Sequence, residues 1–267
     1  MKNPIAVCLD RNPFDSVDAL VEAVRRVGFD RVEWFETGAA EVWTEGRTAA
    51  HIRALMRSHG LTAQYHAPYE APFDLYRDGE RCRSPREISD LLSQCMDRGA
   101  RLDARLLTVH LGSCPGHANR AAALHAVADG FALALPEIER RGMRIAVENH
   151  TGAIINSPLG DKPEEFDWLM NALPAAAIGR TLDIGHAHIN GHLEEFLSRP
   201  LDRVFNMHLH DNAGEQDEHL ALGLGTIQWK ETLARLSRER YEGVITFEFF
   251  APPEEYERCI GMVRAQP

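Results

Sequence analysis

Histidine and carboxylate residues recur in this sequence at the points where short apolar segments end. Glu148, Asp183, His208 and Glu248 each close such a segment. Of the 13 histidines, eight lie at these ends or just beyond them: His66, His110, His150, His186, His188, His208, His210 and His219. Carboxylate oxygens and imidazole nitrogens together are suitable ligands for zinc, manganese, iron, cobalt or magnesium. The pattern predicts a site for a divalent metal ion.

Two interpretations of these residues are open. An ionisable side chain at the end of an apolar segment is costly to bury unless it is paired or binds a metal. Any single histidine of this kind is more often a hydrogen-bonded structural residue, but six polar segment ends that meet in one place favour a shared ion. For Asp217 and His219, which lie two residues apart, the alternative is a solvated surface loop.

The elements that would hold these residues alternate along the whole chain. Short apolar segments predict strands over residues 5–9, 31–35, 62–66, 106–110, 144–148, 179–183, 204–208 and 244–249. Apolar residues spaced by three and four predict helices over 16–27, 48–59, 85–99, 120–141, 163–173, 193–198, 227–238 and 253–263. Eight such units predict a single-domain (β/α)8 barrel over residues 1–267. A doubly wound open sheet is the alternative, which the lack of a G-x-G-x-x-G after the first strand disfavours.

In a barrel of parallel strands, the functional site forms where the carboxyl ends of the strands meet. Glu148, Asp183, His208 and Glu248 come from four consecutive strands, so they can surround one ion. His186 lies three residues beyond a strand end and can reach the same place. His150 and His188 are expected to orient the ligands.

Composition narrows the classes of function. The chain has 29 basic and 40 acidic residues, a net charge of −11, and no basic run longer than two, which disfavours nucleic acid as a partner without excluding it. No segment approaches the roughly 20 apolar residues of a membrane span, and the first residues lack the pattern of a signal peptide. We therefore expect a cytoplasmic protein, with its five cysteines as reduced thiols because no C-x-x-C occurs.

The same motifs carry a family resemblance. From the third strand onward, the chain resembles the xylose-isomerase-like TIM-barrel superfamily, which contains sugar and sugar-phosphate isomerases and epimerases as well as abasic-site nucleases of the endonuclease IV type. The matching segments are His66-Ala-Pro-Tyr69, Val109-His-Leu-Gly-Ser113, Val147-Glu-Asn149, Leu182-Asp-Ile-Gly-His186, His208-Leu-His-Asp-Asn212, Asp217-Glu-His219, Leu222-Gly-Leu-Gly-Thr-Ile227 and Phe247-Glu-Phe249. Each is weak alone, and together they are specific for the superfamily but not for a substrate.

The two branches imply different numbers of ions. The isomerase branch implies one divalent ion on Glu148, Asp183, His208 and Glu248. The nuclease branch implies three zinc ions, with further ligands at the positions of His66, His110, His186, Asp217 and His219. All nine positions hold a residue type that binds metals. We expect one ion, and up to three stay open.

The resemblance implies an isomerase or epimerase acting on a sugar or sugar phosphate. Glu148 and Glu248 would exchange a proton with a metal-stabilised enediolate, and His186 would bind a carbonyl or hydroxyl oxygen. Tyr69, Trp34 and His210 are the expected substrate contacts. The alternatives are a trinuclear zinc phosphodiesterase and a lyase or dehydratase with the same enolate chemistry. Relatives often pair, so a homodimer is left open.

Two segments argue against a nuclease. Residues 70–75 read Glu-Ala-Pro-Phe-Asp-Leu rather than the apolar run expected of members that read DNA. The loop over residues 36–46 carries Glu41 and Glu45 and no arginine or lysine where a DNA-binding loop would need positive charge.

Overall fold

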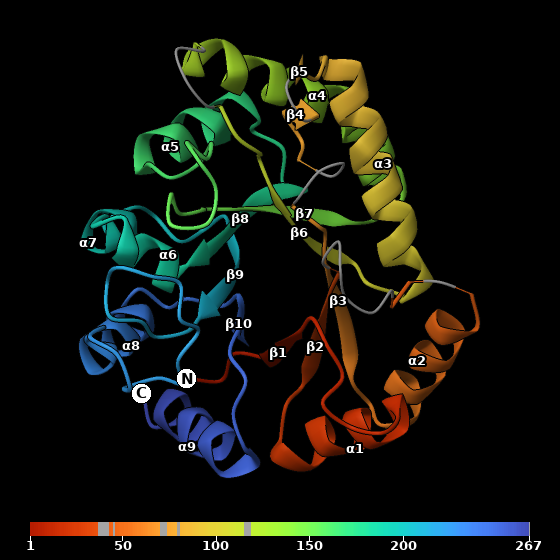
Figure 1. Cartoon of the computed structure of the whole chain (residues 1–267), viewed down its shortest axis with the longest axis vertical. Helices are drawn as coiled ribbons and strands as arrows, with labels where there is room; N and C mark the ends of the chain where they lie inside the picture. The colour runs from red at the N-terminus through yellow and green to blue at the C-terminus, as the bar shows by residue number, and fades with distance from the viewer. Residues whose placement is uncertain (37–42, 45, 70–73, 79–80, 115–118, 267) are drawn as a thin grey trace.

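The fold is a closed barrel of parallel strands surrounded by helices (Figure 1). A computed structural model of the chain describes residues 1–36, 43–44, 46–69, 74–78, 81–114 and 119–266. Neighbouring strands follow the order β1-β10-β9-β8-β7-β6-β3-β2, and every neighbouring pair is parallel. The predicted (β/α)8 barrel is confirmed. The two ends of the chain meet, because the Met1 amino group donates to the carbonyl of Val263.

The strands and helices lie close to the segments that the sequence predicts. The barrel strands are β1 (Ile5–Leu9), β2 (Arg31–Phe35), β3 (Thr62–His66), β6 (Leu106–His110), β7 (Arg144–Glu148), β8 (Ile178–Asp183), β9 (Val204–Leu209) and β10 (Val244–Phe247). The helices are α1 (Val17–Val27), α2 (Gly46–Ser58), α3 (Pro85–Arg101), α4 (Arg120–Arg140), α5 (Pro163–Ala172), α6 (Ile184–Ile189), α7 (Leu193–Leu197), α8 (Trp229–Arg238) and α9 (Pro253–Arg264).

Four elements differ from the prediction. The strand β10 ends at Phe247, so Glu248 lies just beyond it and not within it. The short helix α6 follows β8 directly and was not predicted, because six residues are too few to show a helical period. The hairpin of β4 (Arg77–Asp78) and β5 (Arg81–Cys82) was also not predicted, because strands of two residues carry no alternation.

The inside of the barrel is built in layers, because side chains alternate between the interior and the helices along each strand. Ala6, Leu106, Ala146, Phe205 and Val244 form one buried apolar cluster at the amino end of the strands. A polar layer follows, in which the Thr108 and Thr181 hydroxyls lie 3.2 Å apart. The histidines and carboxylates of the strand ends form the next layer. The interior is therefore polar in its carboxyl half.

The helix α4 is the one described helix whose length and hydropathy match a membrane span, and 44% of that stretch is buried inside the protein. It packs closely against α3. A Cβ atom on Gly130 would lie 2.5 Å from Cγ2 of Ile88, so a residue without a side chain is needed at this contact. The apolar face of α4 is accounted for by this packing.

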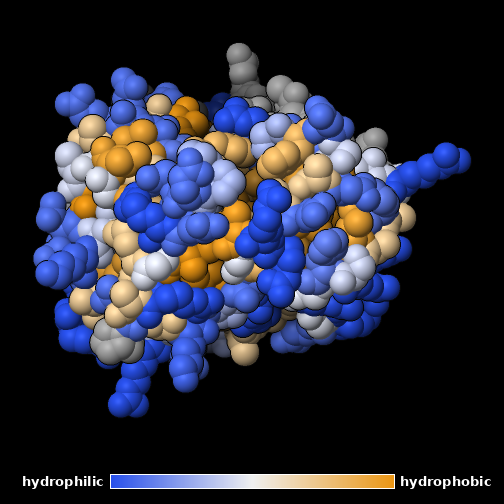
Figure 2. Space-filling model, turned by 90° about the horizontal axis from the view of Figure 1, so that it is seen from below, coloured by the Kyte–Doolittle hydropathy of each residue, from blue (hydrophilic) through white to orange (hydrophobic). Residues whose placement is uncertain are grey.

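The face formed by α1 and α9 is largely hydrophilic, with apolar side chains exposed in a hollow near its centre (Figure 2). A small apolar cavity of about 80 Å³ lies here, with Phe14, Leu20, Val24, Phe250 and Tyr256 among its lining residues. Phe14 and Phe250 remain 41% and 38% exposed. Phe250 also lines the mouth of the barrel, so this hollow adjoins the carboxyl ends of the strands.

The loop after β9 is organised by the buried carboxylate of Asp211. Its Oδ1 accepts the backbone N–H groups of Asn212 and Ile227, at 2.9 and 3.2 Å. Its Oδ2 accepts the backbone N–H of Gly223 and the indole N–H of Trp229, both at 2.8 Å. One side chain thus fixes both ends of the loop that carries Asp217 and His219.

We predict that Asp211→Ala lowers the free energy of unfolding by about 3 kcal/mol, because buried N–H donors are left without an acceptor. Urea unfolding would measure this loss. Asp202→Ala is the matched control, because Asp202 is exposed and such surface changes usually stay within about 0.5 kcal/mol. Equal stability of the two variants would contradict the role given to Asp211.

Candidate metal centre

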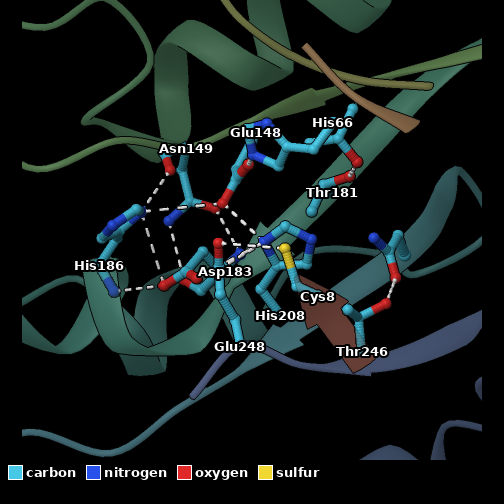
Figure 3. A network of polar contacts seen from close by, with 12 residues as sticks. Cys8, His66, Glu148, Asn149, Thr181, Asp183, His186, His208, Thr246 and Glu248 are labelled. Carbon is cyan, nitrogen blue, oxygen red and sulfur yellow. Dashed lines mark hydrogen bonds and ion pairs between the residues drawn. The ribbon is translucent and has the colours of Figure 1, made fainter. Parts of the chain in front are cut away.

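Four predicted ligands converge at the carboxyl end of the barrel (Figure 3). One ligand atom from each of Glu148, Asp183, His208 and Glu248 lies within 4.8 Å of the others. His208 Nδ1 is 2.9 Å from Glu148 Oε1 and 2.8 Å from Glu248 Oε2. All four side chains are buried. We call this set the central cluster.

A second set shares Glu148 with the first. His66 Nε2 lies 2.9 Å and His110 Nε2 lies 3.3 Å from Glu148 Oε2. The other oxygen of Glu148 faces His208 in the central cluster. His66, His110 and Glu148 form what we call the histidine-pair cluster. A carboxylate whose two oxygens face two sets of ligands has the arrangement needed to bridge two ions.

A third set forms where α6 meets the loop after β9. Asp217 Oδ2 lies 3.4 Å from His186 Nε2 and 2.7 Å from His219 Nε2. His210 Nε2 lies between Asp183 Oδ1, at 3.1 Å, and Asp217 Oδ1, at 3.5 Å. The loop therefore folds back onto the barrel, and Asp217 is 7% exposed, so a solvated loop does not describe it. His186, Asp217 and His219 form the loop cluster.

In the histidine-pair and loop clusters, three imidazole rings are oriented so that one nitrogen faces a carboxylate. His66, His186 and His219 each donate Nδ1–H to a backbone carbonyl, of Ala67, Asn149 and Glu248. In a neutral ring the other nitrogen then carries a lone pair, and in each case it faces a carboxylate oxygen. Two acceptors so close repel each other unless a proton or a metal ion lies between them. The donor set is that of a divalent transition metal.

Glu33 is a candidate functional residue that the sequence pattern did not reveal. Its Oε1 accepts the Nε2–H of His208 at 3.0 Å, which directs Nδ1 of that ring to the central cluster. Its Oε2 accepts from the side-chain amides of Gln64 and Asn206, at 2.7 and 2.8 Å. Carboxylates in this position orient a metal-binding histidine and raise its basicity. The available signal was a glutamate between the apolar residues Val32 and Trp34 in the middle of a strand.

Electrostatics agree with a centre that is short of positive charge. Burial opposes protonation of His208, but Glu148, Glu248 and Glu33 outweigh it and raise its pKa well above the usual value. Burial likewise opposes protonation of His219, but Asp217 and Glu248 raise its pKa to about 9. Without a metal, His208 and His219 are therefore protonated beside these carboxylates.

Two histidines behave differently. Burial lowers the pKa of His110 to about 3, and Glu148 only partly offsets this effect. Burial, together with His110 and His186, lowers the pKa of His150 well below its usual value. These two rings are neutral at physiological pH.

Two of the three expected substrate contacts lie at the metal centre, and the third does not. Tyr69 reaches the centre, with its ring edge-on to those of His110 and His150 at 5.3 Å each. His210 lies in the centre, as described above. Trp34 does not join it: the side chain is fully buried and packs on Trp43 at 4.9 Å, on the face of β2 opposite Glu33. The alternation of a strand sends these neighbours to opposite sides.

The mouth above the centre holds a cavity of about 250 Å³. Its described lining residues are Cys8, Asp10, Arg11, Phe35, Tyr69, His219, Glu248 and Phe250. Residues 37–42, 45 and 70–73, which include Glu41 and Glu45 and much of the segment after Tyr69, lie outside the described residues. The two sequence arguments against a nuclease that rest on them therefore stay predictions.

Comparison with known proteins identifies a family and several relatives. A family model described as xylose isomerase-like TIM barrel matches residues 21–266. "Uncharacterized protein MJ1311" of Methanocaldococcus jannaschii is 26% identical over 241 residues, 88% of this chain and 79% of its own length. "Probable endonuclease 4" of Thermoplasma acidophilum is 30% identical over 199 residues, 67% of this chain and 64% of its own length.

Solved structures share the fold at low sequence identity. A D-tagatose 3-epimerase-like protein has a TM-score of 0.77 and 22% identity, with 98% of this chain and 96% of that chain covered. AP endonuclease, family 2, of Brucella melitensis has a TM-score of 0.75 and 15% identity, with 99% and 100% covered. The IolI protein, solved with a zinc atom, has a TM-score of 0.74 and 18% identity, with 98% and 95% covered.

The raised histidine pKa values predict how stability depends on pH. A histidine whose pKa rises on folding to about 9 stabilises the protein fully below its unfolded value near 6.5, and this contribution is lost as the pH rises through 9. The melting temperature of the metal-free protein should therefore fall between pH 6.5 and 9.5. With bound zinc or manganese the fall should be much smaller, because the ion replaces the protons. Thermal unfolding with and without metal measures both, and a parallel fall in the two forms would contradict the metal centre.

We predict that Glu33→Gln weakens binding of zinc about 10- to 100-fold, because His208 loses the carboxylate that orients it. Competition with a zinc chelator would measure the affinity. Glu87→Gln serves as control, because Glu87 is a hydrogen-bonded carboxylate on the surface at the start of α3. Unchanged zinc affinity in Glu33→Gln would show that His208 needs no such support.

Proposed function

The chain belongs to the xylose isomerase-like TIM barrel family, and from this premise we propose that it is a metal-dependent phosphodiesterase that uses three divalent ions. One observation carries the proposal: the loop cluster of His186, Asp217 and His219 folds onto the barrel beside Glu148, whose two oxygens face two further clusters. A single-ion enzyme needs only the central cluster. This arrangement favours the trinuclear phosphodiesterase, which was the alternative in the sequence analysis. It disfavours the isomerase, which the sequence suggested first.

The histidines and the carboxylate outside the central cluster are costly to bury. His66, His110, His186 and Asp217 are all buried or nearly so. Burying ionisable groups without a partner destabilises a protein strongly, and pairing them with each other recovers only part of that loss. These four residues beyond the central cluster are therefore expected only where further cations bind. Their spacing around shared carboxylates fits a multinuclear site.

The residues divide among the ions by cluster. His66 and His110 would hold one ion with Glu148, the central cluster would hold the second, and the loop cluster the third. When bound, such ions polarise a phosphoryl oxygen and make water a nucleophile at neutral pH. Glu148 fixes the spacing of the first two clusters, and Glu33 holds His208 in position. Asn149 holds His186 through its carbonyl at 2.9 Å.

The substrate has to fit a small mouth with little positive charge. The described lining residues of the cavity of about 250 Å³ include Arg11 and His219, and the latter is cationic when no metal is bound. Tyr69 and Phe35 offer flat rings, 6.0 Å apart, against which a sugar or base can pack. A phosphodiester carrying a sugar therefore suits the site, and the likeness to the probable endonuclease 4 makes abasic-site DNA the first substrate to test.

A second candidate, a sugar isomerase or epimerase, rests on the central cluster alone. Glu148 and Glu248 both approach the same nitrogen of His208, so they would flank one ion and could pass a proton between the two faces of a bound keto sugar. His186 would bind the carbonyl or hydroxyl oxygen. The overall likeness to a D-tagatose 3-epimerase-like protein favours this candidate.

Metal content and activity separate the two. We expect three ions per chain by elemental analysis after reconstitution with zinc or manganese, and cleavage of an oligonucleotide with one abasic site. Asp217→Asn should bind one ion fewer and lose at least about 100-fold in cleavage rate, because the loop cluster loses its shared carboxylate. Asp167→Asn, which alters an exposed partner of Arg199, is the control.

A different set of results would contradict the phosphodiesterase. One ion per chain, no cleavage of abasic-site DNA or of bis(p-nitrophenyl) phosphate, and exchange of a ketose C–H in heavy water that Glu248→Gln abolishes would establish the isomerase instead.

A further inference from the structure

The side chain of His150 is buried in the metal centre but belongs to none of its clusters. It is 2% exposed. Its ring lies 4.4 Å from that of His110 in the histidine-pair cluster and 5.1 Å from that of His186 in the loop cluster, measured between ring centres. Tyr69 covers it edge-on at 5.3 Å. His150 therefore sits between two of the proposed ion positions.

A backbone hydrogen bond fixes its tautomer. The N–H of Thr151 donates to Nδ1 of His150 at 2.9 Å. Because an N–H can only donate, Nδ1 has to carry a lone pair, and in a neutral imidazole the hydrogen is then on Nε2. A nitrogen that carries hydrogen cannot bind a metal ion, so the structure excludes His150 as a ligand through Nε2. The ring presents a hydrogen-bond donor instead.

This donor has no acceptor in the described part of the chain, although it is completely buried. Nδ1 faces the backbone of residue 151, so Nε2 lies on the edge of the ring that points away from it. Unpaired donors of this kind are rare in folded proteins and need an explanation. A ligand that supplies an acceptor when it enters the centre is such an explanation.

The peptide around His150 is held rigidly. Asn190 donates from its side-chain amide to the carbonyl of His150 at 2.8 Å, and the Thr151 hydroxyl donates back to the Asn190 side chain at 3.0 Å. The N–H of His150 bonds the carbonyl of Gly160. The donor is therefore in place before any ligand binds, which is the condition under which it contributes most to a reaction.

We propose that His150 is a catalytic residue that donates a hydrogen bond from Nε2 to a non-bridging phosphate oxygen of the substrate. The inference rests on the proposed phosphodiesterase and extends it. The ions would supply positive charge, and the neutral N–H of His150 beside them would orient the phosphate. An anionic oxygen is the acceptor that suits this site, because hydrogen bonds to charged groups are stronger than those between neutral groups.

The first test needs no turnover. In zinc-loaded protein labelled with 15N-histidine, NMR should show His150 with hydrogen on Nε2, assigned by the loss of its signal in His150→Gln. Inorganic phosphate should shift that Nε2–H signal and weaken its exchange with water. A ring with hydrogen on Nδ1, or a Nε2–H signal that phosphate leaves unchanged, would overturn the proposal.

The second test uses variants. His150→Phe keeps a ring but removes the donor, and should raise the inhibition constant of inorganic phosphate about 10- to 100-fold and lower kcat about 100-fold with zinc content unchanged. His150→Gln, which restores an N–H, should recover part of both. His125→Phe is the control, because His125 is exposed on α4, where it packs on Trp168.

Failure of the inference is distinct from failure of the proposed function. Wild-type cleavage with unaltered phosphate inhibition and kcat in folded His150→Phe would remove the role of His150 and leave the phosphodiesterase standing. Absence of cleavage in the wild type, with phosphate still shifting the Nε2–H signal, would remove the phosphodiesterase and leave His150 as an anion-binding donor.

Discussion

The structure depends on the placement of carboxylates and imidazole lone pairs against each other in the buried upper half of the barrel. Glu148, Asp183, Asp217 and Glu248 face ring nitrogens whose opposite nitrogens are held by carbonyls or by Glu33. Such contacts repel unless a cation lies between the two acceptors. The same geometry therefore raises histidine pKa values and suits a metal ion. Both effects have one cause, because the buried carboxylates lack enough positive charge around them.

Glu148 belongs to both the central cluster and the histidine-pair cluster, because its two oxygens face different histidines. Its position at the end of β7, between β6 and β8, brings His110 to one side and Asp183 to the other. Neighbouring parallel strands in register make this arrangement possible, since strand ends lie about 4.8 Å apart across the sheet.

The sequence predicted what depends on local pattern and missed what depends on contacts between distant strands. The barrel strands, and the ligands at their ends, followed from apolar segments closed by histidine or carboxylate. Glu33 was missed because its partner His208 is 175 residues away. Trp34 was assigned to the substrate because it is aromatic and near a strand end, whereas the alternation of β2 sends it into the helix layer. The meeting of Asp217 with His186 required the fold of a loop without periodicity.

That loop explains how one barrel can host two chemistries. The four residues of the central cluster come from strand ends, which the fold itself positions, so they suit any reaction that one divalent ion supports. Asp217 and His219 come from a loop that Asp211 ties to the barrel through both of its oxygens. His219 is also bonded to the carbonyl of Glu248, which couples the loop to the central cluster. The carboxylate of Asp211 therefore positions Asp217 and His219 against the barrel, whereas the strand ends alone position the central cluster.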